Sequence, residues 1–293
     1  MTDWTRIARH IAAASGEPFA PKSPRAIGGG CINSAVRLSD GHRSYFVKTN
    51  ASSRLAMFEA ELAGLQALAE TRTLRVPQPL CCATTGAQAY LVMEYIQPGV
   101  PGRESPATAG RQLAQLHRCV GQRFGWYRDN TIGATPQPNG QSKDWAVFWR
   151  ENRLGFQLRL AADKGYRGSL QQRGERLLAR CAPLIEHAPC PSLLHGDLWG
   201  GNLTYDACGN PVIYDPAVYY GDREADLAMT ELFGGFPTEF YAAYREAWPL
   251  DPGYDVRKVL YNLYHILNHL NLFGGGYLGQ AQGMIDRLLA ELG

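Results

Sequence analysis

Apolar positions recur with different periods along the first third of the chain. They alternate loosely over 34–40, and Tyr45–Lys48 resumes the alternation after Asp40-Gly41, a dipeptide typical of a hairpin turn. Between residues 55 and 70 they stand three or four apart, which predicts a helix. A short apolar run over 90–96 predicts a buried strand. This part of the chain should therefore form an antiparallel sheet with one long helix.

Helical spacing dominates beyond a connector rich in proline and glycine at 96–102. The helices predicted beyond the connector are 107–119, 144–162, 170–187, 257–273 and 278–292. A further helix is predicted at the N-terminus, over 4–14. A loop fills 120–143, and short strands are expected around 203–205 and 212–214. The pattern predicts an α+β protein of two lobes, with an antiparallel sheet and helix in residues 1–96 and a mainly helical lobe in 97–293.

Composition narrows the classes of protein that fit. The chain has 293 residues and a formal net charge of +2, without the clustered basic face that nucleic-acid binding usually needs. No apolar stretch reaches the length of a membrane span, and the N-terminus does not resemble a signal peptide. Seven cysteines without a C-x-x-C pair favour neither a zinc ribbon nor a disulfide framework. We therefore expect a cytoplasmic protein that binds neither nucleic acid nor membrane.

Candidate chemistry begins in the segment 194–202, which reads Leu-His-Gly-Asp-Leu-Trp-Gly-Gly-Asn. Phosphoryl transfer needs a carboxylate to deprotonate the attacking hydroxyl, and Mg²⁺ needs oxygen ligands. Asp197 suits the first task and Asn202 the second. A β-hairpin would bring Asp215, which ends an apolar strand, beside Asn202 as the main metal ligand. His195 is expected to brace this loop and not to transfer protons.

A segment near the N-terminus suits a phosphate-binding turn before a strand. Its candidate residues are Gly28, Gly29, Gly30 and Asn33. Glycine lets backbone amides approach phosphate oxygens, but the segment is neither a Walker A loop nor a Rossmann fingerprint. Lys48, on the following apolar strand, needs an acidic partner if it is buried. Glu61 on the next helix is the preferred partner, and Glu59 is the alternative.

The apolar run that ends at residue 96 suits the strand and hinge of an adenine pocket. Backbone groups of Glu94 and Ile96 would contact the purine edge, and Met93 would lie at the back of the pocket. An ordinary core strand explains this segment equally well when it is considered alone.

The order of these motifs resembles that of the aminoglycoside phosphotransferase-like kinases. Within them, the chain most resembles the fructosamine kinase (ketosamine 3-kinase) family. The resemblance is carried by 28–33, 133–139, 215–228, 263–269 and Trp145 with Phe148, Arg153 and Gln157. It spans about residues 5–290 and implies a bilobal protein-kinase-like fold. It also implies that ATP and Mg²⁺ are used to phosphorylate the sugar 3-hydroxyl of ketosamines, the rearranged adducts of sugars with amines.

Two departures accompany the resemblance. Gly200 stands where the family commonly has serine, and Pro216 follows Asp215 where protein kinases have Phe-Gly, so a swinging activation loop is not expected. Four further residues are candidate substrate contacts: Trp199, Arg153, His265 and Asn268. Core packing is the alternative for Trp199. His265 and His269, spaced four residues apart, are expected to be a packed or substrate-facing pair, and a metal site is the alternative.

Cys31, inside the glycine turn, is a candidate redox-sensitive thiol, and an inert turn residue is the alternative. Two other functions remain open at this point. The first is another small-molecule kinase of the same fold, acting on an antibiotic, choline or homoserine. The second is a catalytically dead binding module, which the presence of Lys48, Asp197, Asn202 and Asp215 disfavours. The expected partner is a free or protein-bound ketosamine, and the chain is expected to be a monomer or a homodimer.

Overall fold

The structure is a computed structural model that describes residues 2–28 and 32–293. It divides into two compact units. The first comprises Met1–Ser105 and Thr204–Asp215, and the second comprises Pro106–Leu203 and Pro216–Gly293. The division differs from the predicted lobes of 1–96 and 97–293, because the connector and a hairpin from the second half of the sequence belong to the first unit.

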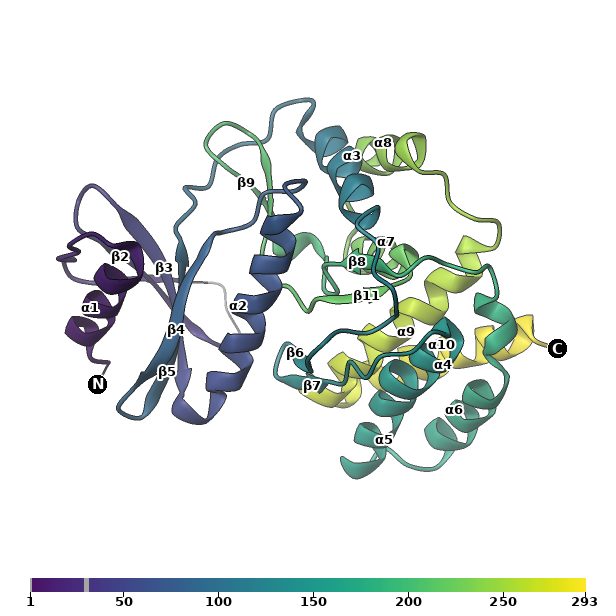
Figure 1. Cartoon of the computed structure of the whole chain (residues 1–293). Helices are drawn as coiled ribbons and strands as arrows, with labels where there is room; N and C mark the ends of the chain where they lie inside the picture. Colours follow the sequence, from purple (N-terminus) through teal and green to yellow (C-terminus); the bar gives the residue numbers. More distant parts are fainter. Residues whose placement is uncertain (1, 29–31) are drawn as a thin grey trace. The chain divides into compact units, whose positions relative to one another are not determined.

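The first unit is built on a five-stranded antiparallel sheet (Figure 1). Its spatial order is β1 (Arg25–Ile27), β2 (Ser34–Ser39), β3 (Ser44–Ala51), β5 (Gln88–Glu94) and β4 (Pro79–Thr85). The tight turn after Ser39 joins β2 to β3, as the Asp40-Gly41 pair predicts. Proline begins the edge strand β4, a place where its missing N–H costs no ladder hydrogen bond.

Two helices pack on this sheet, α1 (Trp4–Ser15) and α2 (Leu55–Glu70). Ile7 and Ile11 of α1 form a buried cluster with Val47 of β3 and Val92 of β5. Successive strand residues point to opposite faces, so Lys48 points away from this cluster. The alternation therefore directs Lys48 toward the face on which Glu61 of α2 reaches it.

A second hairpin completes the first unit. Its strands are β9 (Leu203–Tyr205) and β10 (Pro211–Ile213). The Ile213 N–H donates to the Arg75 carbonyl at 3.0 Å, the Gly99 N–H donates to the Tyr205 carbonyl at 2.9 Å, and Arg75 forms an ion pair with Asp206. These contacts join residues more than a hundred positions apart, so sequence periodicity gave no sign of them.

The second unit is mainly helical, and α9 (Tyr254–Phe273) packs against α5, α7 and α10 at its core. Its other helices are α3 (Ser105–His117), α4 (Trp145–Phe148), α5 (Gly155–Asp163), α6 (Ser169–Arg180), α7 (Arg223–Leu232), α8 (Thr238–Ala247) and α10 (Leu278–Glu291). A π-helical turn, Trp149–Leu154, joins α4 to α5, so the predicted helix over 144–162 is interrupted within its length.

Two small antiparallel strand pairs support the loops of this unit. One pairs β6 (Asn130–Ile132) with β7 (Thr135–Gln137), inside the segment predicted to be a loop, and the other pairs β8 (Ser192–Leu194) with β11 (Tyr219–Gly221). The short 3₁₀ turns of the chain are Ser52–Arg54, Ala182–Ile185, Gly200–Asn202 and Gly275–Tyr277.

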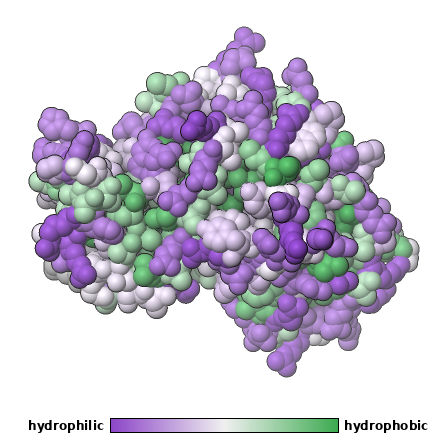
Figure 2. All heavy atoms as spheres, in the orientation of Figure 1, coloured by the Kyte–Doolittle hydropathy of each residue, from purple (hydrophilic) through white to green (hydrophobic). Residues whose placement is uncertain are grey.

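Hydrophilic residues predominate on the face shown in Figure 2, with hydrophobic residues scattered among them. Within the described residues, no helix combines the length and the apolar character that crossing a membrane requires.

Candidate active site

Asp197 lies on the loop that follows β8, in the second unit, and the backbone of this loop is held by a buried carboxylate. Asp226 of α7 accepts hydrogen bonds from the His195 N–H at 2.7 Å and from the Gly196 N–H at 2.8 Å. His195 itself is fully buried. Its Nδ1 accepts a hydrogen bond from the Asp197 N–H at 3.3 Å, which fits the predicted bracing role, and Asp197 itself is half-buried.

The Asp226 carboxylate has a second partner on α3. His117 lies with Nε2 3.2 Å from its Oδ2, and the other His117 nitrogen lies 2.8 Å from the Tyr244 hydroxyl. Burial alone would raise the pKa of Asp226, but the hydrogen bond and charge of His117 lower it below its usual value. Asp222, four residues earlier, caps α7 by accepting from the Glu224 N–H at 3.0 Å. Asp226 thus anchors the loop that carries Asp197, and Asp222 caps the helix to which Asp226 belongs.

Asn202 closes the same loop. Its Nδ2 donates to the Asp197 carbonyl at 2.8 Å and lies 3.4 Å from the Asp197 Oδ2. With the amide nitrogen used in this way, Oδ1 is the atom of Asn202 that could bind a metal ion. Trp199, between the two, is 39% exposed and lies edge-on to Phe233 with ring centroids 6.2 Å apart.

Lys48 forms a three-residue charge cluster in the first unit. Its ammonium donates to Glu61 Oε1 at 2.5 Å and also to Asp215 Oδ1. Burial would lower the pKa of Lys48, but the charges of Asp215 and Glu61 outweigh it and raise the pKa above its usual value. The lysine is therefore cationic at neutral pH. The ion pair predicted with Glu61 is present, and Glu59 is not the partner in this contact.

Asp215 has two properties typical of a functional carboxylate. Its φ is +57°, a left-handed conformation that non-glycine residues rarely adopt. Its side chain is 46% exposed, and Lys48 engages one of its two oxygens, Oδ1. Carboxylate and amide oxygens, such as those of Asp215 and Asn202, are ligand types that Mg²⁺ prefers, so the chemistry of each residue fits a magnesium ligand.

The predicted phosphate-binding turn is described in part. Gly28 has open space around the position that a Cβ would occupy. At the end of the turn, Asn33 Oδ1 accepts a hydrogen bond from Asn50 Nδ2 of β3 at 2.8 Å, which ties the turn to the sheet. Three predicted residues lie outside the described residues: Gly29, Gly30 and Cys31.

The predicted hinge follows β5. Met93 is 2% exposed, which a core strand and the back of a pocket have in common. The Glu94 N–H donates to the Gln78 carbonyl at 2.8 Å, and the Glu94 carboxylate pairs with Arg75 at 2.7 Å. The Glu94 N–H is thus already engaged within the first unit.

Three of the four expected substrate contacts are buried in the second unit. Arg153 is 0%, Asn268 3% and His265 4% exposed. Burial lowers the pKa of His265 to about 3, so its ring is neutral at physiological pH. Direct contact with a substrate requires exposed atoms, and among these four candidates Trp199 has by far the largest exposed fraction, 39%. The geometry favours an internal role for the other three.

Several residues that organise this unit were not singled out as site residues from the sequence. Gln137, Asn139 and Tyr264 were noted as parts of family segments, without a role, and His117 and Asn130 lacked any local signal. Each is buried and hydrogen-bonded to residues distant in the sequence. A buried polar residue does not differ from an exposed one in a single sequence, which is why these residues could not be found.

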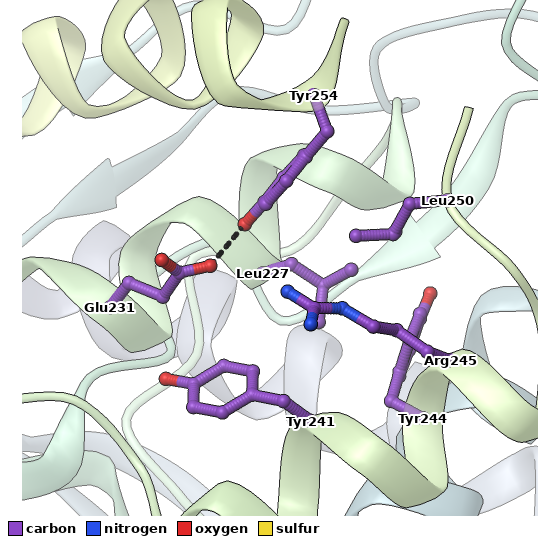
Figure 3. A pocket seen from close by; sticks show the side chains of 7 residues that line it. All are labelled: Leu227, Glu231, Tyr241, Tyr244, Arg245, Leu250 and Tyr254. Atoms are coloured by element: carbon purple, nitrogen blue, oxygen red, sulfur yellow. Dashed lines mark hydrogen bonds between the residues drawn. The ribbon is translucent and has the colours of Figure 1, made fainter. Parts of the chain in front are cut away.

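A small pocket occurs elsewhere in the second unit (Figure 3). It is lined by seven residues: Leu227, Glu231, Tyr241, Tyr244, Arg245, Leu250 and Tyr254. The Tyr254 hydroxyl donates to Glu231 Oε1 at 2.7 Å, and Lys258 pairs with the other oxygen at 2.7 Å. No residue predicted from the sequence to act in catalysis lines this pocket, and its carboxylate is already neutralised.

The antiparallel sheet with its helix, the helical second unit and the two groups of catalytic-type residues define a small-molecule kinase of the protein-kinase-like fold. The model of the fructosamine kinase family matches residues 3–291, so the chain belongs to the fructosamine kinase family. A protein of Synechocystis named "probable ketoamine kinase" is 49% identical to this chain, over 98% of this chain and 97% of its own length. The chloroplastic protein-ribulosamine 3-kinase of Arabidopsis thaliana is 48% identical over 91% of this chain and 82% of its own.

Solved structures agree with this assignment. A protein from Haemophilus somnus, assigned as a fructosamine-3-kinase, has a TM-score of 0.90 at 32% identity and covers 98% of this chain and 97% of its own. The aminoglycoside phosphotransferase APH(4)-Ia, in a ternary complex with AMP-PNP and hygromycin B, has a TM-score of 0.64 at 16% identity, with 98% of each chain covered. The second likeness shows the fold alone.

Proposed function

We propose that this protein is an ATP-dependent kinase that phosphorylates the sugar 3-hydroxyl of ketosamines. Two clusters of polar residues, found in a member of this family, carry the proposal. In the first, Asn202 is hydrogen-bonded to Asp197, and in the second, the Lys48 ammonium is paired with Glu61 and Asp215. Names of relatives at 48% and 49% identity support ketosamines as the substrate class.

Asp197 is proposed as the general base. It accepts the proton of the sugar 3-hydroxyl while that oxygen attacks the γ-phosphorus of ATP, the bond from this phosphorus to the β–γ bridging oxygen breaks, and ADP leaves. The products are a ketosamine 3-phosphate and ADP, with the proton released to solvent. Asp226 accepts hydrogen bonds from the two backbone N–H groups that precede Asp197, and these bonds hold the loop that carries the Asp197 carboxylate. Phosphoryl transfer depends on such positioning of the base.

The nucleotide is proposed to be held by the cationic Lys48 at its phosphates and by the glycine turn at 28–30. The backbone of Glu94 and Ile96 would contact its purine. Asp215 and Asn202 would hold Mg²⁺, which neutralises the triphosphate charge when it is bound. Glu61 keeps the ammonium of Lys48 in place and makes no contact with substrate. The ATP analogue in the related phosphotransferase complex supports ATP as the donor.

A panel of acceptors tests the proposal. Ribulose-lysine, erythrulose-lysine and fructose-lysine are incubated with ATP and Mg²⁺, beside kanamycin, choline and homoserine, and ADP release is coupled to a spectrophotometric readout. We expect turnover with at least one ketosamine, phosphate on its 3-oxygen by ³¹P nuclear magnetic resonance, and loss of turnover in Asp197→Asn. Turnover with an antibiotic, choline or homoserine alone, or with no acceptor, would refute the proposal.

A further inference from the structure

We propose that Gln137 is a positioning residue for the reaction. Through a hydrogen bond to the Ala217 carbonyl, two residues after Asp215, it fixes the loop that carries Asp197. The inference deepens the proposed function and rests on it for the identity of the reaction. Every contact used below lies within the second unit, among the described residues.

Gln137, the last residue of β7, uses its side-chain amide fully. Its Nε2 donates to the Ala217 carbonyl at 3.0 Å and to Asn130 Oδ1 at 2.8 Å, and its Oε1 accepts from the Tyr264 hydroxyl at 2.7 Å. The residue is fully buried. A buried amide with all these groups paired is rigid, because any rotation leaves donors or acceptors unsatisfied.

Ala217, the target of this amide, is in direct contact with the catalytic loop. Its N–H donates to the His195 carbonyl at 2.8 Å. Gly196, the next residue, has φ +83°, and a Cβ there would lie 2.1 Å from the Ala217 carbonyl oxygen. The Gln137 amide therefore holds an oxygen on which the backbone of the loop packs, one residue before Asp197.

A second amide holds the neighbouring carbonyl. Asn130 Nδ2 donates to the Val218 carbonyl at 2.8 Å, and Asn130 Oδ1 accepts from both Gln137 and Asn139. The segment directly after Asp215 and Pro216 is thus fixed by side chains at two consecutive peptide groups. This segment begins where a protein kinase has its activation loop, and here it is tied to the interior.

Arg153 completes the network, and its partners there account for the burial of its charge. Its guanidinium donates to the Pro138 carbonyl at 2.6 Å and to Asn139 Oδ1 at 2.7 Å, and its Cζ lies 3.9 Å from the centroid of the Tyr219 ring. Among the described residues, no carboxylate forms an ion pair with it, so carbonyl oxygens and aromatic faces stabilise its charge. Its place in a π-helical turn agrees with the association of such turns with functional regions.

This arrangement predicts an effect on catalysis that is separate from substrate binding. Gln137 and Arg153 are 0% exposed, so their removal should not delete a substrate contact. It should instead let Asp197 shift relative to the acceptor hydroxyl, and a displacement of about 1 Å costs on the order of 10²-fold in rate. Loss of Gln137 should therefore lower kcat and leave KM nearly unchanged.

The test compares Gln137→Leu with Gln171→Leu. Gln171 is the matched control, because its Nε2 also donates to two carbonyls, those of Leu158 and Tyr166, in a region without catalytic residues. Steady-state kinetics use the acceptor that the parent protein phosphorylates, with each variant normalised to its folded fraction. We expect kcat of Gln137→Leu to fall by about 10- to 100-fold with each KM within about threefold, and kcat of Gln171→Leu to fall less than about twofold.

Hydrogen exchange gives a readout that needs no substrate. In Gln137→Leu, the amides of 194–198 and 217–220 should exchange faster than in the parent, whereas Gln171→Leu should leave them unchanged. If the parent phosphorylates no acceptor, the proposed function fails while this measurement still decides whether Gln137 holds the loop. Should Gln137→Leu fail to fold, Tyr264→Phe replaces it, because it keeps the ring and removes only the hydroxyl that donates to Gln137.

Three results would overturn the inference. The first is a kcat for Gln137→Leu, or for its substitute Tyr264→Phe, within twofold of the parent. The second is an equal fall of kcat in Gln171→Leu, which would assign the effect to general destabilisation. The third is a KM for the acceptor that rises while kcat is unchanged, which would make the network part of the substrate site.

Discussion

Replacing Gly196 by alanine should impair both stability and catalysis, because this position admits no side chain. Its φ of +83° lies in the left-handed region, where an L-residue costs about 1–2 kcal/mol more than glycine. The added Cβ would also stand 2.1 Å from the Ala217 carbonyl oxygen, and ordinary contact begins near 3.4 Å. The loop or the 217 peptide must therefore move by about 1.3 Å.

Two magnitudes follow from this displacement. Overpacking of a close-packed interior adds about 1–3 kcal/mol to the backbone strain, so we expect a loss of roughly 2–5 kcal/mol in the free energy of unfolding. For a chain of this size, that loss lowers Tm by about 3–8 °C. Because Asp197 is the next residue, a shift of about 1 Å in the loop should lower kcat on the order of 10²-fold.

Thermal unfolding by circular dichroism and steady-state kinetics at 20 °C measure both quantities. Gly200→Ala is the matched control on the same loop, since its Cβ would have no neighbour within 4 Å and its φ is outside the left-handed region. We expect the control to differ little from the parent in Tm and in kcat. If Gly196→Ala shows a Tm within 2 °C and a kcat within twofold of the parent, the close approach of Gly196 to Ala217 is not a constraint and the reasoning is wrong.

Other perturbations test separate parts of the site. Asp197→Asn should lower kcat by about 10²–10⁴-fold while ATP still binds, as measured by calorimetry, and an undiminished kcat would reject the general base. Asp215→Ala should lose activity that excess Mg²⁺ does not restore, whereas Asn202→Ala should be milder and partly recover at high Mg²⁺; equal activity of the two variants would contradict the proposed ligands. The N–H of Asn210 chiefly lowers the pKa of Asp206 to about 2, so its stabilising effect is present above pH 3.8 and is lost as pH falls toward 2. The difference in unfolding free energy between the parent and Asp206→Asn should therefore shrink over this range in urea titrations, and a constant difference would contradict the assigned pKa.

Local structure in the first unit could be predicted because it depends on near neighbours in the chain. The helix over 55–70 coincides with α2, and the turn after Ser39 joins β2 to β3 as predicted. The partnership of Lys48 with Glu61 could also be expected, since it joins a strand to the helix that follows it. Likewise, the string from His195 to Asn202 carries its chemistry in a few consecutive residues.

Other features depend on pairs of residues far apart in the sequence, and only the tertiary structure decided them. The β9–β10 hairpin belongs to the first unit because it bonds to Arg75 and Gly99, more than a hundred residues earlier. The two small strand pairs in the second unit, β6–β7 and β8–β11, were missed. Strands of three residues have a weak pattern, and only β9 and β10, which adjoin the motifs of Asn202 and Asp215, were expected.

The roles of polar residues show the same division. The family resemblance marked Arg153, His265 and Asn268 as candidate substrate contacts. The fold buries all three, and it recruits Gln137, whose sequence neighbours give no hint of its partners, to hold the Ala217 carbonyl. The sequence alone determined which groups could perform the chemistry. Burial and the pairing of distant residues decided which of them are available to a substrate and which hold the others in place, because both depend on packing that no short stretch of sequence encodes.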